Sequence, residues 1–331
     1  MNWMTTDDDR ECFDRYLNDF VPDRVYDVHA HLWRRQDWGD DPPLIVQAAP
    51  VEVGLDVYRK AIGWILPDRK VHGLHFAFPA VFPTDTASQN RWVAEQIRRD
   101  PLARGQYFVR PDDDPDFTAA EVKRLGLRGF KVFTGFLNRP DKENAEIPEY
   151  FPEWIARLAD REGWTVTLHQ HRSRSLADPS NIHWINHYCR NYPNMRLILD
   201  HCARGFNPYH LIEGLRRLER HPNLYVDTSV ACNPLAVIAC LQFFGAKNVL
   251  YASDFFCSHL RGTNFPVGDS FMWLDEDAPI WDGVAYGRRP VLIGLENLRA
   301  VRCAFEVLRL SDRDVEDYFW NNAAELLGVQ G

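Results

Sequence analysis

Eight short runs of apolar and β-branched residues recur along the chain, with amphipathic segments between them. The runs are VYDVHAH (25–31), GLHFAFP (73–79), GQYFVRP (105–111), LRGFKVFTG (127–135), WTVTLHQH (164–171), MRLILDHC (195–202), NLYVDTS (223–229) and NVLYASD (248–254). The segments between them, such as SQNRWVAEQIRRD and FPEWIARLADREG, carry apolar residues at helical spacing. Strands that alternate with helices favour right-handed βαβ units and a parallel sheet. Because a TIM barrel contains eight such units, we predict an α/β chain with the (β/α)8 barrel fold.

Two segments are longer than the usual connections between strands and helices. Residues 32–70, after the first predicted strand, contain LDVYRKAIGWILPDRK and are predicted to add a helix. Residues 255–289, after the eighth, are rich in aromatic residues, Gly and Pro and are predicted to form a long loop. Long insertions in a compact domain usually serve as lids or binding loops. A helix at 291–309 and another beginning at the N-cap residue Ser311 are predicted to end the chain.

The length of 331 residues suits one barrel, which needs ~250 residues plus insertions. No linker divides the sequence, so we predict a single domain over residues 1–331. Hydrophobic residues make up 45 % and charged residues 26 %, as in soluble globular proteins. The net charge of −9 argues against nucleic acid as a partner, because phosphate binding needs a basic face.

The N-terminal residues MNWMTTDDDRECFDRY are polar and acidic, unlike a signal peptide. No stretch reaches the ~18 consecutive apolar residues of a membrane span, so no membrane partner is expected. The seven cysteines are widely spaced and form no CxxC motif, which favours reduced thiols. Together these features predict a cytoplasmic protein.

Polar residues stand where several predicted strands end, and a barrel carries its active site at that end of the strands. These residues are His29, His31, Arg110, Lys131, His169, His171, His201 and Asp254. His29 and His31 project to the same side of a strand and can converge on one cation. Each residue alone has a structural explanation; Asp254, for example, could cap a helix. Four of eight buried strands ending in imidazole or carboxylate, however, predict a functional site at one mouth of the barrel.

The ordered set of these residues resembles the amidohydrolase superfamily: His-x-His on the first strand, Lys on the fourth, His on the fifth and sixth, and Asp on the eighth. The phrases DVHAHLW, LILDHCARG, VLYASD and NNAAELLG most resemble its "amidohydrolase 2" branch, over residues 25–328. That branch includes aminocarboxymuconate-semialdehyde decarboxylase, resorcylate-type decarboxylases and lactone hydrolases. The resemblance implies that His29, His31, His169 and Asp254 hold a divalent metal, with a water completing the site.

Imidazoles with one carboxylate suit Zn²⁺ better than Ca²⁺ or Mg²⁺, which prefer oxygen ligands. A bound divalent ion lowers the pKa of its water towards ~7 and so makes hydroxide available. The resemblance implies that Asp254 takes the proton as the nucleophile attacks. His201 then fits as a general acid or base beside the metal.

Lys131 leaves two alternatives for the metal count. In binuclear members of the superfamily, a lysine at this place is carboxylated and bridges two metals, and His169 and His201 would then hold the second ion. In mononuclear members that role is absent, and His201 stays free for catalysis. We favour one metal ion over two.

Arginines indicate the substrate class, because a guanidinium binds a carboxylate with two hydrogen bonds. Those at or just beyond predicted strand ends are Arg110, Arg172, Arg174, Arg204 and Arg261. We expect a small anionic substrate whose carboxylate is bound chiefly by Arg172 or Arg204, with His171 and His259 as further residues near the mouth. In the long last loop, Trp273, Trp281 and Tyr286 could cover a ring of this substrate.

The leading hypothesis is a metal-dependent hydrolase that cleaves a C–N or C–O bond in an amide, cyclic amide or lactone. The alternative is a metal-dependent, non-oxidative decarboxylase, a lyase, acting on a carboxylated ring or a muconate-type substrate. A third reading is a non-catalytic barrel that binds metal or metabolite. The chain has no GxGxxG, GxxxxGK[ST] or GxSxG motif for dinucleotide, nucleotide or serine-nucleophile chemistry. Self-association into a homo-oligomer is compatible with the apolar outer helices.

Overall fold

The computed structural model describes residues 3–38, 49–78, 85–283 and 290–330. Parallel strands occupy all eight predicted positions, although Pro79 at the end of the second run lies outside the described residues. The strands are β1 (Arg24–Arg34), β3 (Lys70–Ala77), β4 (Arg104–Gly105), β5 (Tyr107–Phe108), β6 (Gly129–Val132), β7 (Thr165–Leu168), β8 (Arg196–Leu199), β9 (Leu224–Asp227) and β10 (Val249–Leu250). The third predicted strand is divided into β4, which pairs with β3, and β5, which pairs with β6. It therefore joins the β1–β3–β4 sheet to the sheet that runs from β5 to β10.

The first and last strands close the barrel. The backbone N–H of Val28 donates to the carbonyl of Tyr251 at 3.1 Å, and that of Asp254 donates to the carbonyl of His29 at 2.8 Å. Ala30 and Phe255 form a parallel β-bridge beyond them. These contacts confirm the predicted α/β barrel.

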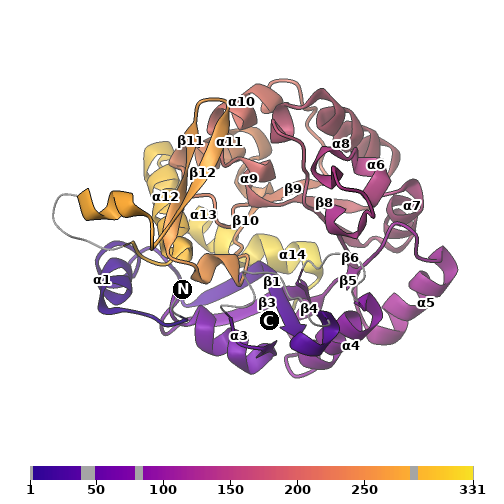
Figure 1. Ribbon diagram of the computed structural model, residues 1–331, viewed down its shortest axis with the longest axis horizontal. Coiled ribbons are helices and arrows are strands. Elements are labelled where there is room, and N and C mark those ends of the chain that lie inside the picture. The colour runs from indigo at the N-terminus through magenta and orange to yellow at the C-terminus, as the bar shows by residue number, and fades with distance from the viewer. Residues whose placement is uncertain (1–2, 39–48, 79–84, 284–289, 331) are drawn as a thin grey trace.

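Helices surround the strands (Figure 1). They are α1 (Asp7–Tyr16), α3 (Leu55–Ile62), α4 (Thr86–Ile97), α5 (Pro115–Leu125), α6 (Ile147–Tyr150), α7 (Glu153–Glu162), α8 (Pro179–Asn191), α9 (His201–Arg204), α10 (Pro208–Leu215), α11 (Pro234–Phe244), α12 (Ile293–Leu308), α13 (Asp312–Glu316) and α14 (Asn322–Leu327). Local sequence sets their ends: α8 begins at N-cap Asp178, whose carboxylate accepts from the N–H of Ser180, with Pro179 in the first helical turn. In the described part of the chain, no helix combines the length and apolarity needed to cross a membrane.

Two apolar cores support the barrel. The outer core lies between strands and helices and includes Val25, Ala30 and Leu32 from β1. The inner core includes Tyr26 and Val28 of the same strand, with residues of α14 packed against it. A register shift between β1 and β3, at residues 27–30, interrupts the alternation of β1 side chains between the outer and the inner core. Such irregularities re-aim side chains; here His29, within the shift, and His31, beyond it, both contact Asp254.

The insertion after β1 contains the predicted helix, α3, together with the short strand β2 (Glu52–Val53); residues 39–48 of this insertion lie outside the described residues. The insertion after β10 is not the long loop that we predicted. It forms the antiparallel hairpin of β11 (Gly262–Val267) and β12 (Ser270–Asp275), in orange in Figure 1. Gly268 and Asp269 form its two-residue turn, and Gly268 has the positive φ of 56° that such turns require. Residues 284–289 of the predicted loop lie outside the described residues.

The C-terminal predictions are confirmed, since α12 covers 293–308 and α13 begins after Ser311. The Ser311 hydroxyl accepts from the N–H of Asp314 and the Asp314 carboxylate accepts from the N–H of Ser311, a capping box. Several polar residues, however, lie beyond the strand ends rather than at them. β7 ends at Leu168, β8 at Leu199 and β10 at Leu250, so His169 and Asp254 belong to the loops that follow, and His201 begins α9.

Candidate metal centre

Three buried side chains bring ligand atoms together between the first strand and the segment after the last. The Nε2 atoms of His29 and His31 are 3.2 Å apart. Oδ1 of Asp254 lies 3.5 Å from Nε2 of His29 and 3.3 Å from Nε2 of His31. The three side chains can hold a metal ion, as expected from the His-x-His spacing.

Hydrogen bonds at Nδ1 determine the protonation of both imidazoles. Nδ1 of His29 lies 2.9 Å from Oδ2 of Asp227, and Nδ1 of His31 lies 2.9 Å from the carbonyl oxygen of Ala77. An ionised carboxylate and a carbonyl only accept hydrogen bonds, so Nδ1 carries the hydrogen in each ring. Each neutral ring then presents a lone pair at Nε2. Two lone pairs and a carboxylate oxygen this close repel one another unless a positive charge lies among them.

The spacing and the charge of the centre fit a divalent ion. Ligand atoms of a tetrahedral zinc site with Zn–N bonds near 2.05 Å are about 3.3 Å apart, close to the distances given above. The buried carboxylates of Asp200, Asp227 and Asp254, set against the ammonium of Lys131, leave two formal negative charges. A divalent cation would balance this charge, which in a buried region is otherwise costly.

The pKa shifts of Asp254 and His29 also show that the centre favours positive charge. Burial alone would raise the pKa of Asp254, but its contacts with His29, His31 and His201 outweigh burial and hold the pKa far below its usual value. Burial and Lys131 would lower the pKa of His29, yet the carboxylates of Asp200, Asp254 and Asp227 raise it. The centre therefore attracts a cation or a proton.

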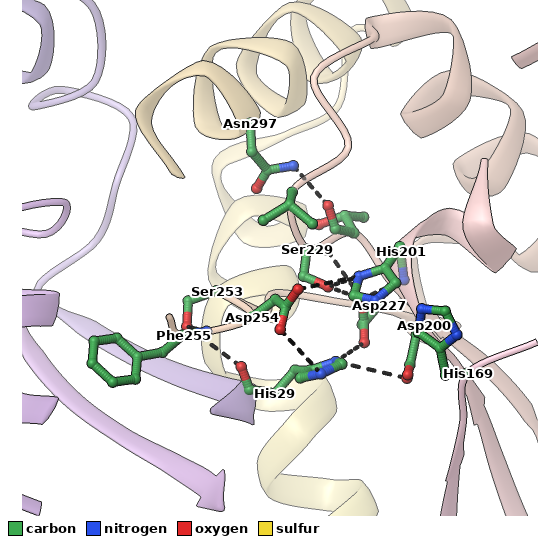
Figure 2. Close-up of polar contacts among 12 residues, drawn as sticks. His29, His169, Asp200, His201, Asp227, Ser229, Ser253, Asp254, Phe255 and Asn297 are labelled. Atoms are coloured by element: carbon green, nitrogen blue, oxygen red, sulfur yellow. Dashed lines mark hydrogen bonds and ion pairs between the residues drawn. The ribbon is translucent and has the colours of Figure 1, made fainter. Parts of the chain in front are cut away.

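His201 lies beside the three ligands, with its ring centroid 5.2 Å from that of His29 (Figure 2). Its Nδ1 lies 2.8 Å from the Ser229 hydroxyl, whereas Oδ2 of Asp254 is 4.0 Å away. Burial lowers the pKa of His201, so its ring is neutral near pH 7. In the described residues no hydrogen bond occupies its Nε2, which can therefore accept or donate a proton.

Backbone strain is concentrated around this centre. The residues of α9, His201 to Arg204, all have φ between 52° and 57°, and Asp254 has φ 52°. Left-handed backbone costs roughly 1–2 kcal/mol per non-glycine residue. Strain of this kind gathers at functional sites, and here it falls on predicted site residues.

His169 is held near the centre by a chain of hydrogen bonds. Its Nδ1 lies 2.9 Å from Nε2 of His171, whose Nδ1 lies 2.5 Å from a carboxylate oxygen of Glu143 in the short helix η3 (Lys142–Asn144). Glu143 can only accept, so His171 donates to it and accepts from His169. This leaves Nε2 of His169 as a lone pair. The His169 ring centroid is 5.1 Å from that of His201, outside the group of three convergent ligands.

Lys131 pairs with the carboxylate of Asp200 inside the barrel, and its ammonium lies 5.0 Å from the centre of the Phe76 ring. Both charged groups are buried. Asp200, His29 and His201 form a second group of side chains whose ligand atoms lie close together.

The structure brings only some of the predicted arginines to the site. Arg204 ends α9, donates to the carbonyl of Arg172 at 2.9 Å and lies 5.5 Å from the Phe271 ring centre. Burial lowers its pKa, which nearby Glu143 raises only in part. In the described part of the chain it forms no ion pair.

The other arginines are engaged elsewhere. Arg172 pairs with Asp178 at 2.9 Å, Arg174 with Glu213 at 2.8 Å and Arg110 with Asp112 at 3.1 Å. Arg261 is buried against Asp9 of α1, at 2.6 Å and 2.9 Å, and is not part of the metal centre. His259 is likewise structural, since its Nε2 lies 2.8 Å from the carbonyl of Ala61.

Aromatic side chains of the hairpin cover the side of the centre next to His201. Phe206 stacks on the His201 ring at 5.6 Å and contacts Phe271 at 5.0 Å and Trp273 at 5.1 Å. Trp281 instead donates to the carbonyl of Asp275 at 2.5 Å, and Tyr286 lies outside the described residues.

Sequence reasoning missed Asp200, Asp227 and Glu143. Asp227 ends the buried strand β9, and Asp200 directly precedes His201, so the rule that singled out the histidines applied to both. Glu143 gave no such signal, because it lies in a polar loop far from any strand end.

Comparisons with known proteins agree with this geometry. A family model described as "Amidohydrolase" matches residues 26–329. No curated protein matches the chain. Among solved structures, a candidate 2-pyrone-4,6-dicarboxylic acid hydrolase from Pseudomonas putida has a TM-score of 0.54 at 19 % identity, covering 94 % of this chain and 100 % of that one.

Two further structures contain metal ions. An amidohydrolase from Burkholderia multivorans with bound zinc has a TM-score of 0.57 at 13 % identity, covering 92 % and 99 % of the two chains. A 5-carboxyvanillate decarboxylase from Novosphingobium aromaticivorans, complexed with manganese and 4-hydroxy-3-methoxy-5-nitrobenzoic acid, has a TM-score of 0.58 at 15 % identity, covering 99 % of each chain. At these identities the structures show a shared fold, whereas the family model spans nearly the whole sequence. The chain therefore belongs to the amidohydrolase family of enzymes.

Proposed function

We propose that this enzyme is a metal-dependent hydrolase that cleaves a C–N or C–O bond in a small carboxylate-bearing substrate. The observation that carries the proposal is the convergence of His29, His31 and Asp254, whose ligand atoms lie 3.2–3.5 Å apart with both Nδ1 atoms already engaged. His169 would complete the ligand set, because its Nδ1 is also engaged and its Nε2 is a lone pair.

Two residues beside the ion would transfer protons: Asp254 would accept one and His201 would deliver one. When bound, a divalent ion supplies Lewis acidity and activates water. Oδ1 of Asp254 faces the two Nε2 atoms and would hold the ion, which leaves Oδ2, on the side of His201, to accept the proton that the nucleophile loses. Nε2 of His201 can first take up a proton and then deliver it to the leaving group, because the ring is neutral near pH 7 and Ser229 holds its other nitrogen.

One metal ion is favoured over two because Lys131 is already paired. Its nitrogen contacts the buried Asp200 carboxylate, whereas carboxylation would need that nitrogen to be free to form a carbamate.

Arg204 is the proposed anchor for the substrate carboxylate, and Phe206, Phe271 and Trp273 would face its apolar part. Arg204 is half-buried beside His201, with no carboxylate partner among the described residues. The substrates named for two structural relatives, 2-pyrone-4,6-dicarboxylic acid and 5-carboxyvanillate, both carry carboxylates.

The second candidate function is non-oxidative decarboxylation at the same site, which exchanges a carboxylate for a proton. Nε2 of His201 favours it, because no hydrogen bond occupies this atom among the described residues and it would protonate the carbanion that loss of CO₂ leaves. The hydrogen bonds from Glu143 through His171 to His169 connect the centre to solvent, since the Glu143 side chain is 64 % exposed.

Metal analysis and product analysis test these proposals. Protein purified without added metal should contain about one equivalent of zinc, manganese or iron, and the His29→Ala and Asp254→Ala variants should lose it. Two equivalents would contradict the single ion, and no metal even after supplementation would contradict the proposed function. With carboxylate-bearing lactones, amides and aromatic acids as substrates, a ring-opened or cleaved product would support hydrolysis, whereas CO₂ release would support decarboxylation.

A further inference from the structure

Asp227, at the end of β9, contacts the imidazole of His29 with one oxygen and, with the other, the backbone of His201 and the Ser229 hydroxyl beside the His201 ring (Figure 2). Oδ2 lies 2.9 Å from Nδ1 of His29. Oδ1 accepts hydrogen bonds from the backbone N–H of His201 at 2.8 Å and from the Ser229 hydroxyl at 2.6 Å. The side chain of Asp227 is fully buried, so no water competes for these oxygens.

The contact with Ser229 fixes the tautomer of His201. The Ser229 hydroxyl has one hydrogen, and it donates this hydrogen to Asp227, which can only accept. The same oxygen lies 2.8 Å from Nδ1 of His201 and must therefore accept from that nitrogen. Nδ1 of His201 then carries hydrogen, and Nε2 is left for proton transfer.

The contact with His29 acts on the metal ligand in the same way. Nδ1 of His29 donates to Oδ2 of Asp227, so Nε2 presents its lone pair to His31 and Asp254. Oδ1 of Asp227 also accepts from the backbone N–H of Ser229 at 3.0 Å. The backbone N–H groups and the hydroxyl around this carboxylate all donate to it, so Asp227 acts as an acceptor towards both side chains.

We propose that Asp227 is a positioning residue that fixes the hydrogen on Nδ1 of both His29 and His201, through Ser229 in the second case. One carboxylate thus prepares a metal ligand and a proton-transfer group together. This inference rests on the proposed function for the role of the metal, whereas the hydrogen positions can be observed directly.

Two-bond ¹⁵N–¹H correlation spectra of the histidine rings test the hydrogen positions, with signals assigned from His29→Gln and His201→Gln. In zinc-loaded protein, both Nδ1 atoms should carry hydrogen. In Ser229→Ala, His201 should change to a mixture of tautomers while His29 is unaffected. A hydrogen on Nε2 of His201 in the wild type, or an unchanged His201 signal in Ser229→Ala, would overturn the proposal.

Zinc affinity, measured by chelator competition, tests the hydrogen bond between Asp227 and His29. Asp227→Asn should weaken zinc binding roughly 10–100-fold, the usual effect of losing a carboxylate that orients a ligand. The zinc affinity of Ser229→Ala should stay within about twofold of the wild-type affinity, well below the 10–100-fold loss expected for Asp227→Asn. The matched control is Thr228→Val, which removes the adjacent buried bond to Tyr318 at 2.6 Å without touching an imidazole. Equal zinc affinity in Asp227→Asn and wild type would overturn the proposal.

The outcomes separate this inference from the proposed function. If the wild-type protein binds no zinc, the proposed function fails, but the His201 tautomer can still be read in metal-free protein. If Asp227→Asn does not fold, the wild-type and Ser229→Ala spectra still decide the assignment.

Discussion

The ring nitrogens of the metal-centre histidines differ in what they can do. Nδ1 of His29, His31, His169 and His201 faces, respectively, a carboxylate, a carbonyl, another imidazole and a hydroxyl. Each partner is an acceptor or is itself fixed as one, so each ring keeps Nε2 for the metal or for protons. Which nitrogen of each histidine can bind metal or transfer a proton is therefore decided by the group that contacts Nδ1.

Glu143 gives the first prediction at the residue scale. Glu143→Gln places an amide, which can donate, against Nδ1 of His171 and disturbs the tautomers of His171 and His169. We expect zinc affinity to fall about tenfold or more, with the free energy of unfolding of the metal-free protein nearly unchanged because Glu143 is exposed.

Chelator competition measures this affinity, and Glu146→Gln is the matched control, since Glu146 lies just beyond the same short helix and touches no histidine. Equal losses in both variants would indicate a general charge effect instead of a specific hydrogen-bonded chain.

At the scale of elements, one ion pair fastens α1 to the barrel. Asp9 accepts from the guanidinium of Arg261 and from the N–H of Leu292, at 3.0 Å, and it also closes the capping box with Thr6. Arg261 further donates to the carbonyl of Met4 at 2.8 Å. The guanidinium that seemed suited to a substrate therefore holds the N-terminal helix.

We predict that Arg261→Met lowers the free energy of unfolding by about 3–5 kcal/mol, because it leaves the Asp9 carboxylate buried without its opposite charge. The metal content and KM should stay unchanged. Denaturant unfolding measures the loss, and the double variant Asp9→Asn/Arg261→Met should recover part of it. A raised KM with unchanged stability would instead place Arg261 in substrate binding.

The same pair predicts a pH dependence. Burial alone would raise the pKa of Asp9, but its bonds with Arg261 and Thr6 hold it below the usual value. A carboxyl with a lowered folded pKa contributes stability above its unfolded pKa, about 3.9, and this stability is lost as the pH falls further through the folded pKa. The difference in unfolding free energy between wild type and Asp9→Asn should therefore shrink below about pH 4; a constant difference down to pH 2 would contradict the assignment.

The hairpin gives a prediction about the substrate. The Trp273 side chain contacts Phe206 beside His201, whereas its neighbour Met272 points to the opposite face of the strand. Trp273→Ala should raise KM about fivefold, as the loss of an aromatic contact worth about 1 kcal/mol implies. Met272→Ala, which alters a side chain of similar exposure (48 % against 41 %), should leave KM unchanged. Equal effects in steady-state kinetics would mean that the hairpin acts only through its stability.

The strands and the His29–His31 pair could be predicted from sequence because both depend on local periodicity. The hairpin could also have been predicted, since the pair Gly268 and Asp269 is a turn signal between two short runs with aromatic and apolar residues, but its aromatic and proline content resembled a loop. The partners of Arg261, Lys131 and His171 could not be predicted. Each lies in a distant segment, and a charged side chain carries no sign of which opposite charge it will meet.

At the scale of the whole molecule, the metal centre spans the seam where the barrel closes. His29 and His31 come from the first strand and Asp254 from the segment after the last, next to the hydrogen bonds that join them. A bound ion would therefore link the two ends of the sheet.

Metal removal should accordingly lower the thermal stability. An ion at one hundred times its Kd stabilises the folded state by about 2.7 kcal/mol, which corresponds to a Tm shift of about 4 °C for a chain of this length. Calorimetry with and without a chelator measures the shift, and Asp254→Ala should show none. A wild-type Tm that does not respond to the chelator or to added zinc would contradict a metal at this seam.

The position of the seam also has a consequence for biosynthesis. The two histidines leave the ribosome more than 220 residues before Asp254 does. At about 5–20 residues per second, this interval lasts roughly 10–45 s. During it the nascent chain carries an incomplete set of ligands, so the ion is taken up only after translation has nearly finished, and the supply of metal in the cell at that moment decides which ion the enzyme receives.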